Sequence, residues 1–167
     1  MDIVILAGGK GTRLGLKSKP KPLALINGKS VIEYQLDSAE KYNFKRIYIM
    51  LGYMGNQIKK IVNDRYKKSF EIIYFTEKKP LGTAGALYQL KNTLKKKFLV
   101  FYADTIFNIN LKKLILFDSK RSSEGCLVCH PNDHPNDSDL IEFDFSKRIV
   151  KIHPYPHINK YYANNVN

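Results

Sequence analysis

A glycine-rich run that carries two cations, residues 6–14 (LAGGKGTRL), is the stretch of this chain best suited to chemistry. It follows an apolar segment, residues 2–6, that is typical of a buried strand. Glycines let backbone N–H groups approach phosphate oxygens, and Lys10 and Arg13 add positive charge. The run favours phosphate binding over a plain turn, although its spacing fits neither the dinucleotide fingerprint nor the P-loop.

A further cation follows in the segment Pro20-Lys21-Pro22-Leu23. Prolines on both sides restrict the backbone, so we expect Lys21 to lie in an extended segment. A lysine fixed in this way can place a point charge on a phosphate. Taken alone, the segment would indicate only a proline turn on the surface.

Together these motifs resemble the signature of the sugar-nucleotide pyrophosphorylases, the nucleotidyltransferases that join a nucleoside triphosphate to a sugar 1-phosphate. That family carries Leu-Ala-Gly-Gly-x-Gly-Thr-Arg-Leu, a short spacer, and then Pro-Lys-Pro-Leu or Pro-Lys-Pro-Met. Residues 77–86 (EKKPLGTAGA) look like its base-binding segment. Residues 98–104 (FLVFYAD) look like the strand that ends in its metal-binding aspartate. The motifs follow the family's order and span nearly the whole chain.

The resemblance implies a set of site residues and one cofactor. Arg13, Lys21 and Asp104 would be catalytic, and Asp104 would also hold Mg²⁺. A sugar 1-phosphate oxygen would attack the α-phosphorus in line and release pyrophosphate, a reaction that needs positioning and charge rather than a protein nucleophile. The implied nucleotide-binding residues are Leu6, Ala7, Gly8, Gly9, Gly11, Thr12, Arg13, Lys21, Glu77, Gly82 and Thr83.

The identity of the base follows from the chemistry of Glu77. An ionised carboxylate accepts two hydrogen bonds and donates none, which matches the adjacent N1–H and N2–H₂ donors of guanine. We therefore expect GTP to be preferred over UTP. The alternative is that Glu77 is a solvated residue at a strand end and that the backbone near Leu81 and Gly82 holds the base.

The segment HPNDHPNDSD, residues 130–139, packs histidine and aspartate closely, so a metal site must be weighed. Proline after each histidine stiffens the run, which favours a loop beside the sugar. The segment resembles one in guanylyltransferases that make GDP-activated heptose or mannose. This resemblance implies a sugar 1-phosphate of heptose or mannose type.

Apolar periodicity supplies the elements that must position these residues. Strands are predicted at residues 2–6, 46–51, 70–75, 98–103, 125–129, 140–145 and 148–152. Helices are predicted from a capping box at Ser30 to a stop near Asn43, and at residues 56–62, 84–94 and 111–117, the last capped by Asn110. The pattern indicates an α/β fold: a Rossmann-like, mainly parallel sheet with helices on both faces and a β-rich C-terminal part. Ligands of such sheets bind at the carboxyl ends of the strands.

We expect one nucleotidyltransferase domain over residues 1–167, with a nucleotide-binding half at 1–123 and a β-rich, sugar-binding part at 124–167. Relatives continue past the final Val166-Asn167 to a second metal-binding acidic residue, so the second part is expected to be incomplete. The alternative function is a catalytically impaired protein that binds a nucleotide or a sugar nucleotide.

Composition excludes some classes of protein and leaves others open. The formal net charge is +13, but the lysines are scattered, which disfavours nucleic-acid binding and leaves steering of anionic substrates. No apolar run is long enough to span a bilayer and no signal peptide is evident, so we expect a cytoplasmic protein with no membrane partner. Cys126 and Cys129 are expected to be reduced core residues. A homo-oligomer is left open.

Overall fold

The computed structural model describes residues 1–9, 19–79, 81–94, 97–131 and 138–156. The chain forms two compact units, residues 1–113 and residues 114–167. Among the helices of the described ranges, none has the length and apolar character needed to cross a membrane.

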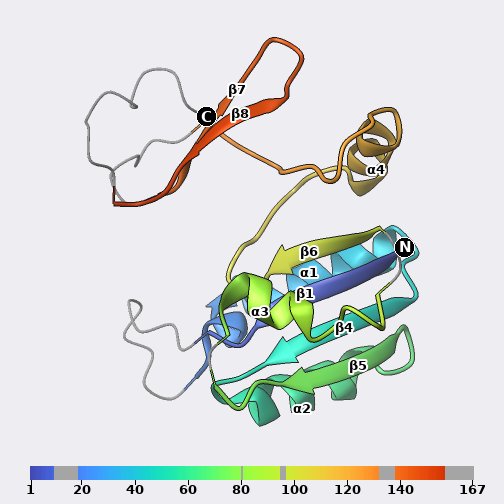
Figure 1. The fold of residues 1–167 in the computed structure, drawn as a ribbon. Helices are drawn as coiled ribbons and strands as arrows, with labels where there is room; N and C mark the ends of the chain where they lie inside the picture. The colour runs from blue at the N-terminus through green and yellow to red at the C-terminus, as the bar shows by residue number, and fades with distance from the viewer. Residues whose placement is uncertain (10–18, 80, 95–96, 132–137, 157–167) are drawn as a thin grey trace. The chain divides into compact units, whose positions relative to one another are not determined.

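The first unit is built on a four-stranded parallel sheet in the order β5-β4-β1-β6 (Figure 1). The strands are β1 (Asp2–Ala7), β4 (Arg46–Leu51), β5 (Glu71–Thr76) and β6 (Phe98–Tyr102). The chain passes from β1 to β4 and β5, and then returns to β6 on the other side of β1. Strands that are buried on both faces read as nearly continuous apolar runs, and β1 and β4 do so.

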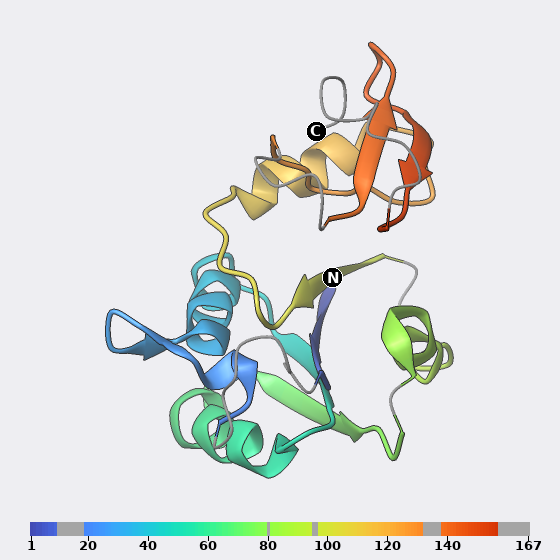
Figure 2. The same ribbon diagram turned by 90° about the vertical axis from the view of Figure 1, so that its left-hand side faces the viewer.

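Helices cover both faces of this sheet, so the predicted α/β architecture is confirmed. Helices α1 (Val31–Lys41) and α2 (Gly55–Tyr66) lie on one face, and α3 (Gly82–Tyr88) lies on the other (Figure 2). Side chains alternate between the two faces of a strand. On the α3 face, the buried core consists of Val4, Tyr48, Met50, Ala86 and Leu90.

The N-terminus of α1 has the capping box that the sequence predicts. Glu33 accepts hydrogen bonds from the backbone N–H and the hydroxyl of Ser30. The other carboxylate oxygen of Glu33 pairs with Arg65 of α2. The cap therefore also ties together the two helices on this face of the sheet.

A short 3-10 helix, η2 (Lys21–Leu23), replaces the extended segment predicted for Lys21. Leu23 N donates to Pro20 O at 2.9 Å, and Ala24 N donates to Lys21 O at 2.9 Å. Proline is tolerated in the first turn of a helix because its missing N–H has no partner there. The prolines are therefore compatible with a turn, and the prediction of an extended segment at Lys21 was wrong.

A small hairpin follows, with β2 (Leu25–Ile26) paired to β3 (Lys29–Ser30) in antiparallel fashion. Its two connecting residues, Asn27 and Gly28, have φ angles of 50° and 78°. Asn-Gly is the strongest short signal for such a turn, because both residues tolerate positive φ. This hairpin was not among the elements predicted from the sequence.

The second unit contains a two-stranded antiparallel sheet of β7 (Leu140–Phe143) and β8 (Ile149–His153). Helix α4 (Leu111–Ser119) spans the boundary between the units, and Asn110 Oδ1 accepts a hydrogen bond from Lys113 N at 3.1 Å. The predicted cap of this helix is thus confirmed.

The predicted strand at residues 125–129 is absent from the described residues of this unit. Its apolar side chains Leu127 and Val128 are 57% and 56% exposed, because the segment has no strand ladder to bury them. Cys126 is half-buried, Cys129 is exposed, and both are free thiols. The prediction that these cysteines lie in the core was therefore wrong.

Candidate active site

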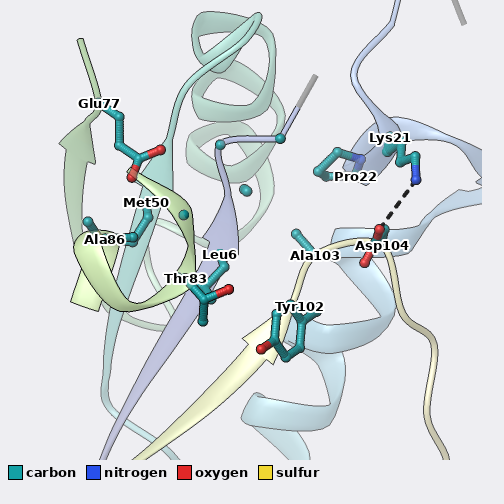
Figure 3. Close-up of a pocket in the computed structure, with 14 residues that line it drawn as sticks. Leu6, Lys21, Pro22, Met50, Glu77, Thr83, Ala86, Tyr102, Ala103 and Asp104 are labelled. Atoms are coloured by element: carbon teal, nitrogen blue, oxygen red, sulfur yellow. Dashed lines mark hydrogen bonds and ion pairs between the residues drawn. The ribbon is translucent and has the colours of Figure 1, made fainter. Parts of the chain in front are cut away.

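One cavity of about 320 Å³ lies at the carboxyl edge of the parallel sheet (Figure 3). The loops that follow β1 and β6 both contribute to it, at the point where the strand order reverses direction. The predicted site residues that line it are Leu6, Ala7, Gly8, Gly9, Lys21, Glu77, Gly82, Thr83 and Asp104. Residues that are far apart in the sequence thus line the same cavity.

The glycine edge of the cavity is formed by Gly8 and Gly9, directly after β1. The turn that follows β4 packs against it: Tyr53 N donates to Gly8 O at 3.3 Å. A Cβ atom on Gly52 would lie 2.5 Å from that same oxygen, so only glycine permits this approach. Gly52 was not predicted from the sequence, because the contact joins two segments far apart in the chain.

The charged side of the cavity is an ion pair between Lys21 and Asp104. Lys21 Nζ lies 3.5 Å from Asp104 Oδ2, and the two side chains are 24% and 50% exposed. Lys21 belongs to η2, and Asp104 lies in the turn that follows β6. A solvated pair at this distance is weak, so either group can take a ligand as its partner.

The acidic side of the cavity is the carboxyl group of Glu77, which follows β5. Its backbone N donates to Leu51 O at 2.8 Å and so fixes the residue beside β4. Oε1 is buried and has no hydrogen-bond partner among the described residues. Burial raises the pKa of this carboxyl. A buried acceptor without a partner is unfavourable, and a ligand that brought a donor to it would relieve that state.

The acidic side and the charged side of the cavity lie apart. In Figure 3, Glu77 lies on one side of β1, whereas Lys21 and Asp104 lie on the other. Thr83 lies between them, on the α3 side. A ligand that filled the cavity would therefore meet an acceptor carboxylate at one end and a charged pair at the other. This suits an elongated molecule with hydrogen-bond donors at one end and, at the other, a negative charge that Lys21 can bind when it leaves Asp104.

Five lining residues were not selected from the sequence: Pro22, Met50, Ala86, Tyr102 and Ala103. They carry no charge, so residue type alone gave no reason to choose them. Their position was the available signal, because Met50 and Tyr102 lie at the carboxyl ends of β4 and β6.

Some predicted site residues lie outside the described residues. These are Gly11, Thr12 and Arg13 of the glycine run, and residues 132–137 of the histidine-rich segment. Within the described ranges, no group of three or more His, Cys, Asp or Glu residues is arranged to hold a metal ion. Asp104, the residue predicted to hold a metal ion, lines the cavity.

Comparison with known proteins adds an independent finding. A family model described as nucleotidyl transferase matches residues 2–165. The D-glycero-alpha-D-manno-heptose 1-phosphate guanylyltransferase of Campylobacter jejuni is 38% identical over 122 residues, which cover 72% of this chain and 55% of that protein. The bifunctional protein GlmU of Methanococcus maripaludis is 32% identical over 169 residues, covering 100% of this chain and 38% of that protein.

Among solved structures, HddC from Yersinia pseudotuberculosis in complex with GMP-PN matches with a TM-score of 0.66 and 30% identity. The match covers 90% of this chain and 68% of that one. Measured against the curated relatives, this chain spans between about a third and about half of their length, 38% for GlmU and 55% for the guanylyltransferase.

Proposed function

We propose, because this chain belongs to the nucleotidyl transferase family and is of the sugar-nucleotide pyrophosphorylase type, that it joins GTP to a sugar 1-phosphate and releases pyrophosphate. The observation that carries this proposal is the meeting of Gly8, Lys21, Glu77 and Asp104 around one cavity. The names of the guanylyltransferase relatives support a sugar of heptose or mannose type.

In the proposed reaction, an oxygen of the sugar 1-phosphate forms a bond to the α-phosphorus while the bond to the departing pyrophosphate breaks. Gly8 and Gly9 line the cavity, and their backbone would approach the phosphates. Lys21 leaves Asp104 and neutralises negative charge on the reacting phosphates. Arg13, which lies outside the described residues, would stabilise the negative charge that develops on the departing pyrophosphate.

The residues fit a Mg²⁺ ion that arrives with the nucleotide. Mg²⁺ is commonly held by one or two carboxylates together with substrate phosphates, rather than by a full set of protein ligands. Asp104 supplies one half-exposed carboxylate at the cavity. The ion would supply charge neutralisation at the phosphates, and Asp104 would hold it there.

The base is assigned to the end of the cavity formed by Glu77. The unpartnered Oε1 of Glu77 supports a ligand that brings hydrogen-bond donors. Guanine presents N1–H and N2–H₂ side by side, so an ionised carboxylate can accept from both. The similarity to HddC in complex with GMP-PN supports a guanine nucleotide as the ligand.

The test is a screen of pyrophosphate release with GTP, UTP, CTP and ATP, each combined with mannose, heptose, glucose and N-acetylglucosamine 1-phosphates. We expect release with GTP that requires both a mannose- or heptose-type sugar phosphate and Mg²⁺. GTP binding without release would support the alternative, a nucleotide-binding protein without turnover. Salt-sensitive RNA or DNA binding that GTP does not displace would support nucleic-acid binding instead.

A further inference from the structure

A buried amide on α1 holds the loop that carries Asp104. Gln35 is 1% exposed, in the interior of the first unit. Its Nε2 donates to Tyr102 O at 2.7 Å and to Thr105 O at 2.7 Å. These two carbonyls lie on either side of Asp104 in the sequence, so a single NH₂ group spans the turn in which the carboxylate stands.

The amide adds a support that the backbone of this loop does not provide. Ala103 N donates to Leu6 O at 3.1 Å, which continues the pairing of β6 with β1. Thr105 N donates to Tyr102 O at 3.1 Å, which closes the turn on itself. The bonds from Gln35 tie the same turn to α1, a separate element, and so set its position as well as its shape.

Core packing alone does not explain a glutamine at position 35. The next residue on α1, Leu36, is fully buried and apolar, as the core face of a helix requires. Gln35 Oε1 is buried and has no hydrogen-bond partner among the described residues. A buried amide that is satisfied on one side only is unfavourable compared with an apolar side chain. What Gln35 contributes is the two hydrogen bonds that its Nε2 donates to the loop.

We infer that Gln35 is a positioning residue that fixes the turn of residues 102–105 and thereby holds the Asp104 carboxylate at the cavity. The role of Asp104 toward Mg²⁺ rests on the proposed function. The hold of Gln35 on the loop does not, because it is carried by the two hydrogen bonds alone. The two parts can therefore be tested separately.

The first arm measures hydrogen exchange of the full chain without nucleotide. Gln35→Met removes both donors at nearly constant volume, and Gln35→Asn keeps the amide but shortens its reach. Ile32→Val is the matched control, since Ile32 is fully buried on the same helix. We expect amides of residues 102–105 to exchange about tenfold faster in both Gln35 variants. The exchange of β4 should stay as in the control.

Equal acceleration in the loop and in β4 would mean that Gln35 contributes only general stability, and this would overturn the inference. Loop exchange no faster than in Ile32→Val would overturn it as well. Neither result depends on whether the chain turns over a nucleotide.

The second arm measures the Mg²⁺ requirement of pyrophosphate release. We expect the Mg²⁺ concentration for half-maximal rate to rise about 10- to 100-fold in both Gln35 variants, as is typical when a group that supports a metal ligand is removed. The KM for GTP should change little, and Ile32→Val should match the unmodified chain. An unchanged Mg²⁺ requirement in an active Gln35→Met variant would overturn the link to Asp104. If the unmodified chain itself shows no Mg²⁺-dependent release, the proposed function fails, while the exchange arm still decides the hold on the loop.

Discussion

Glu77 combines a buried acceptor with a place at the edge of the cavity, so its chemistry is the most direct test of base choice. Glu77→Gln replaces one acceptor with a donor, which no longer matches the two donors of guanine but matches the N3–H and a carbonyl of uracil. We expect the ratio of kcat/KM for GTP over UTP to fall by about 10- to 100-fold, from a loss of about 1–3 kcal/mol. Pyrophosphate release with each nucleotide measures it.

The matched control is Glu71→Gln, the same change at the opposite end of β5. Glu71 is paired with Arg46 rather than with the cavity. This control should leave the GTP/UTP ratio unchanged. An unchanged ratio in Glu77→Gln would instead assign the base to backbone groups near Gly82.

The pKa of Glu77 gives a prediction for pH. Burial raises it above the ordinary value of 4.5, so the folded protein holds this proton more tightly than the unfolded chain does. The contribution of this group to stability is therefore greatest below 4.5 and is lost as pH rises through the raised pKa. The affinity for guanine changes with pH in the opposite direction, because only the ionised carboxylate accepts two hydrogen bonds.

We accordingly expect GTP affinity to weaken as pH falls from neutral toward 4.5, beginning at a higher pH than an ordinary glutamate would give. Calorimetric titration of GTP across this range, compared with Glu77→Gln, measures the effect. The variant should show a flatter profile. A profile that is identical in both proteins would mean that Glu77 does not bind the base.

Gly8 and Gly9 form a matched pair of variants. A Cβ atom on Gly8 would lie 2.6 Å from Glu77 Oε2, whereas one on Gly9 meets nothing within 4 Å. The obstructing atom is the end of a flexible side chain, so Gly8→Ala should displace Glu77 without unfolding the protein. We expect Gly8→Ala to weaken GTP binding by about tenfold, or ~1.4 kcal/mol, and to change the unfolding midpoint little. Gly9→Ala should retain more of the affinity, and equal losses in both would mean that Glu77 is not the group affected.

At the scale of elements, the sequence predicted what depends on neighbouring residues. Apolar runs identified β1, β4, β5 and β6, and the capping box identified the start of α1. The prediction of a strand at 125–129 was wrong, because an apolar run does not reveal whether another strand pairs with it. The segment at Lys21 was predicted to be extended, and this was wrong. Prolines restrict φ, but they do not determine which backbone hydrogen bonds form.

The gathering of the site was predictable to the extent that strand ends meet at one edge of a parallel sheet. This placed Gly8, Glu77 and Asp104 together, and they line one cavity. Gln35 and Gly52 could not be found in this way. Their importance comes from contacts with Tyr102 and Gly8, which exist only once separate elements have packed.

A prediction about how the elements pack concerns Gly52. Its Cβ position lies 2.5 Å from Gly8 O and 2.8 Å from Gly8 Cα, both of them backbone atoms that cannot rotate away. Gly52→Ala must therefore separate the end of β4 from the loop after β1, at a cost of about 1–3 kcal/mol in the free energy of unfolding. Urea unfolding measures this, with Gly9→Ala as the control. A Gly52→Ala variant as stable as Gly9→Ala would mean that the two segments are not held in contact.

At the scale of the whole molecule, the described residues of the cavity all belong to the first unit, residues 1–113. The sheet, its covering helices α1–α3 and the core around Val4 and Tyr48 belong to it too. The second unit carries the segment predicted to lie beside the sugar. Nucleotide binding and sugar selection are therefore expected to separate along the chain.

A fragment of residues 1–119, which keeps α4 whole, tests this separation. Because the sheet has its own core and is large enough to fold alone, we expect cooperative urea unfolding of the fragment and GTP affinity within about threefold of the full chain, a difference below ~1 kcal/mol. Release of pyrophosphate that depends on a sugar 1-phosphate should be lost. Calorimetric titration of GTP and the release assay measure the two properties in one preparation. A folded fragment that does not bind GTP would show that residues 120–167 contribute to the nucleotide site, and a fragment that keeps full turnover would show that the sugar site lies within the first unit.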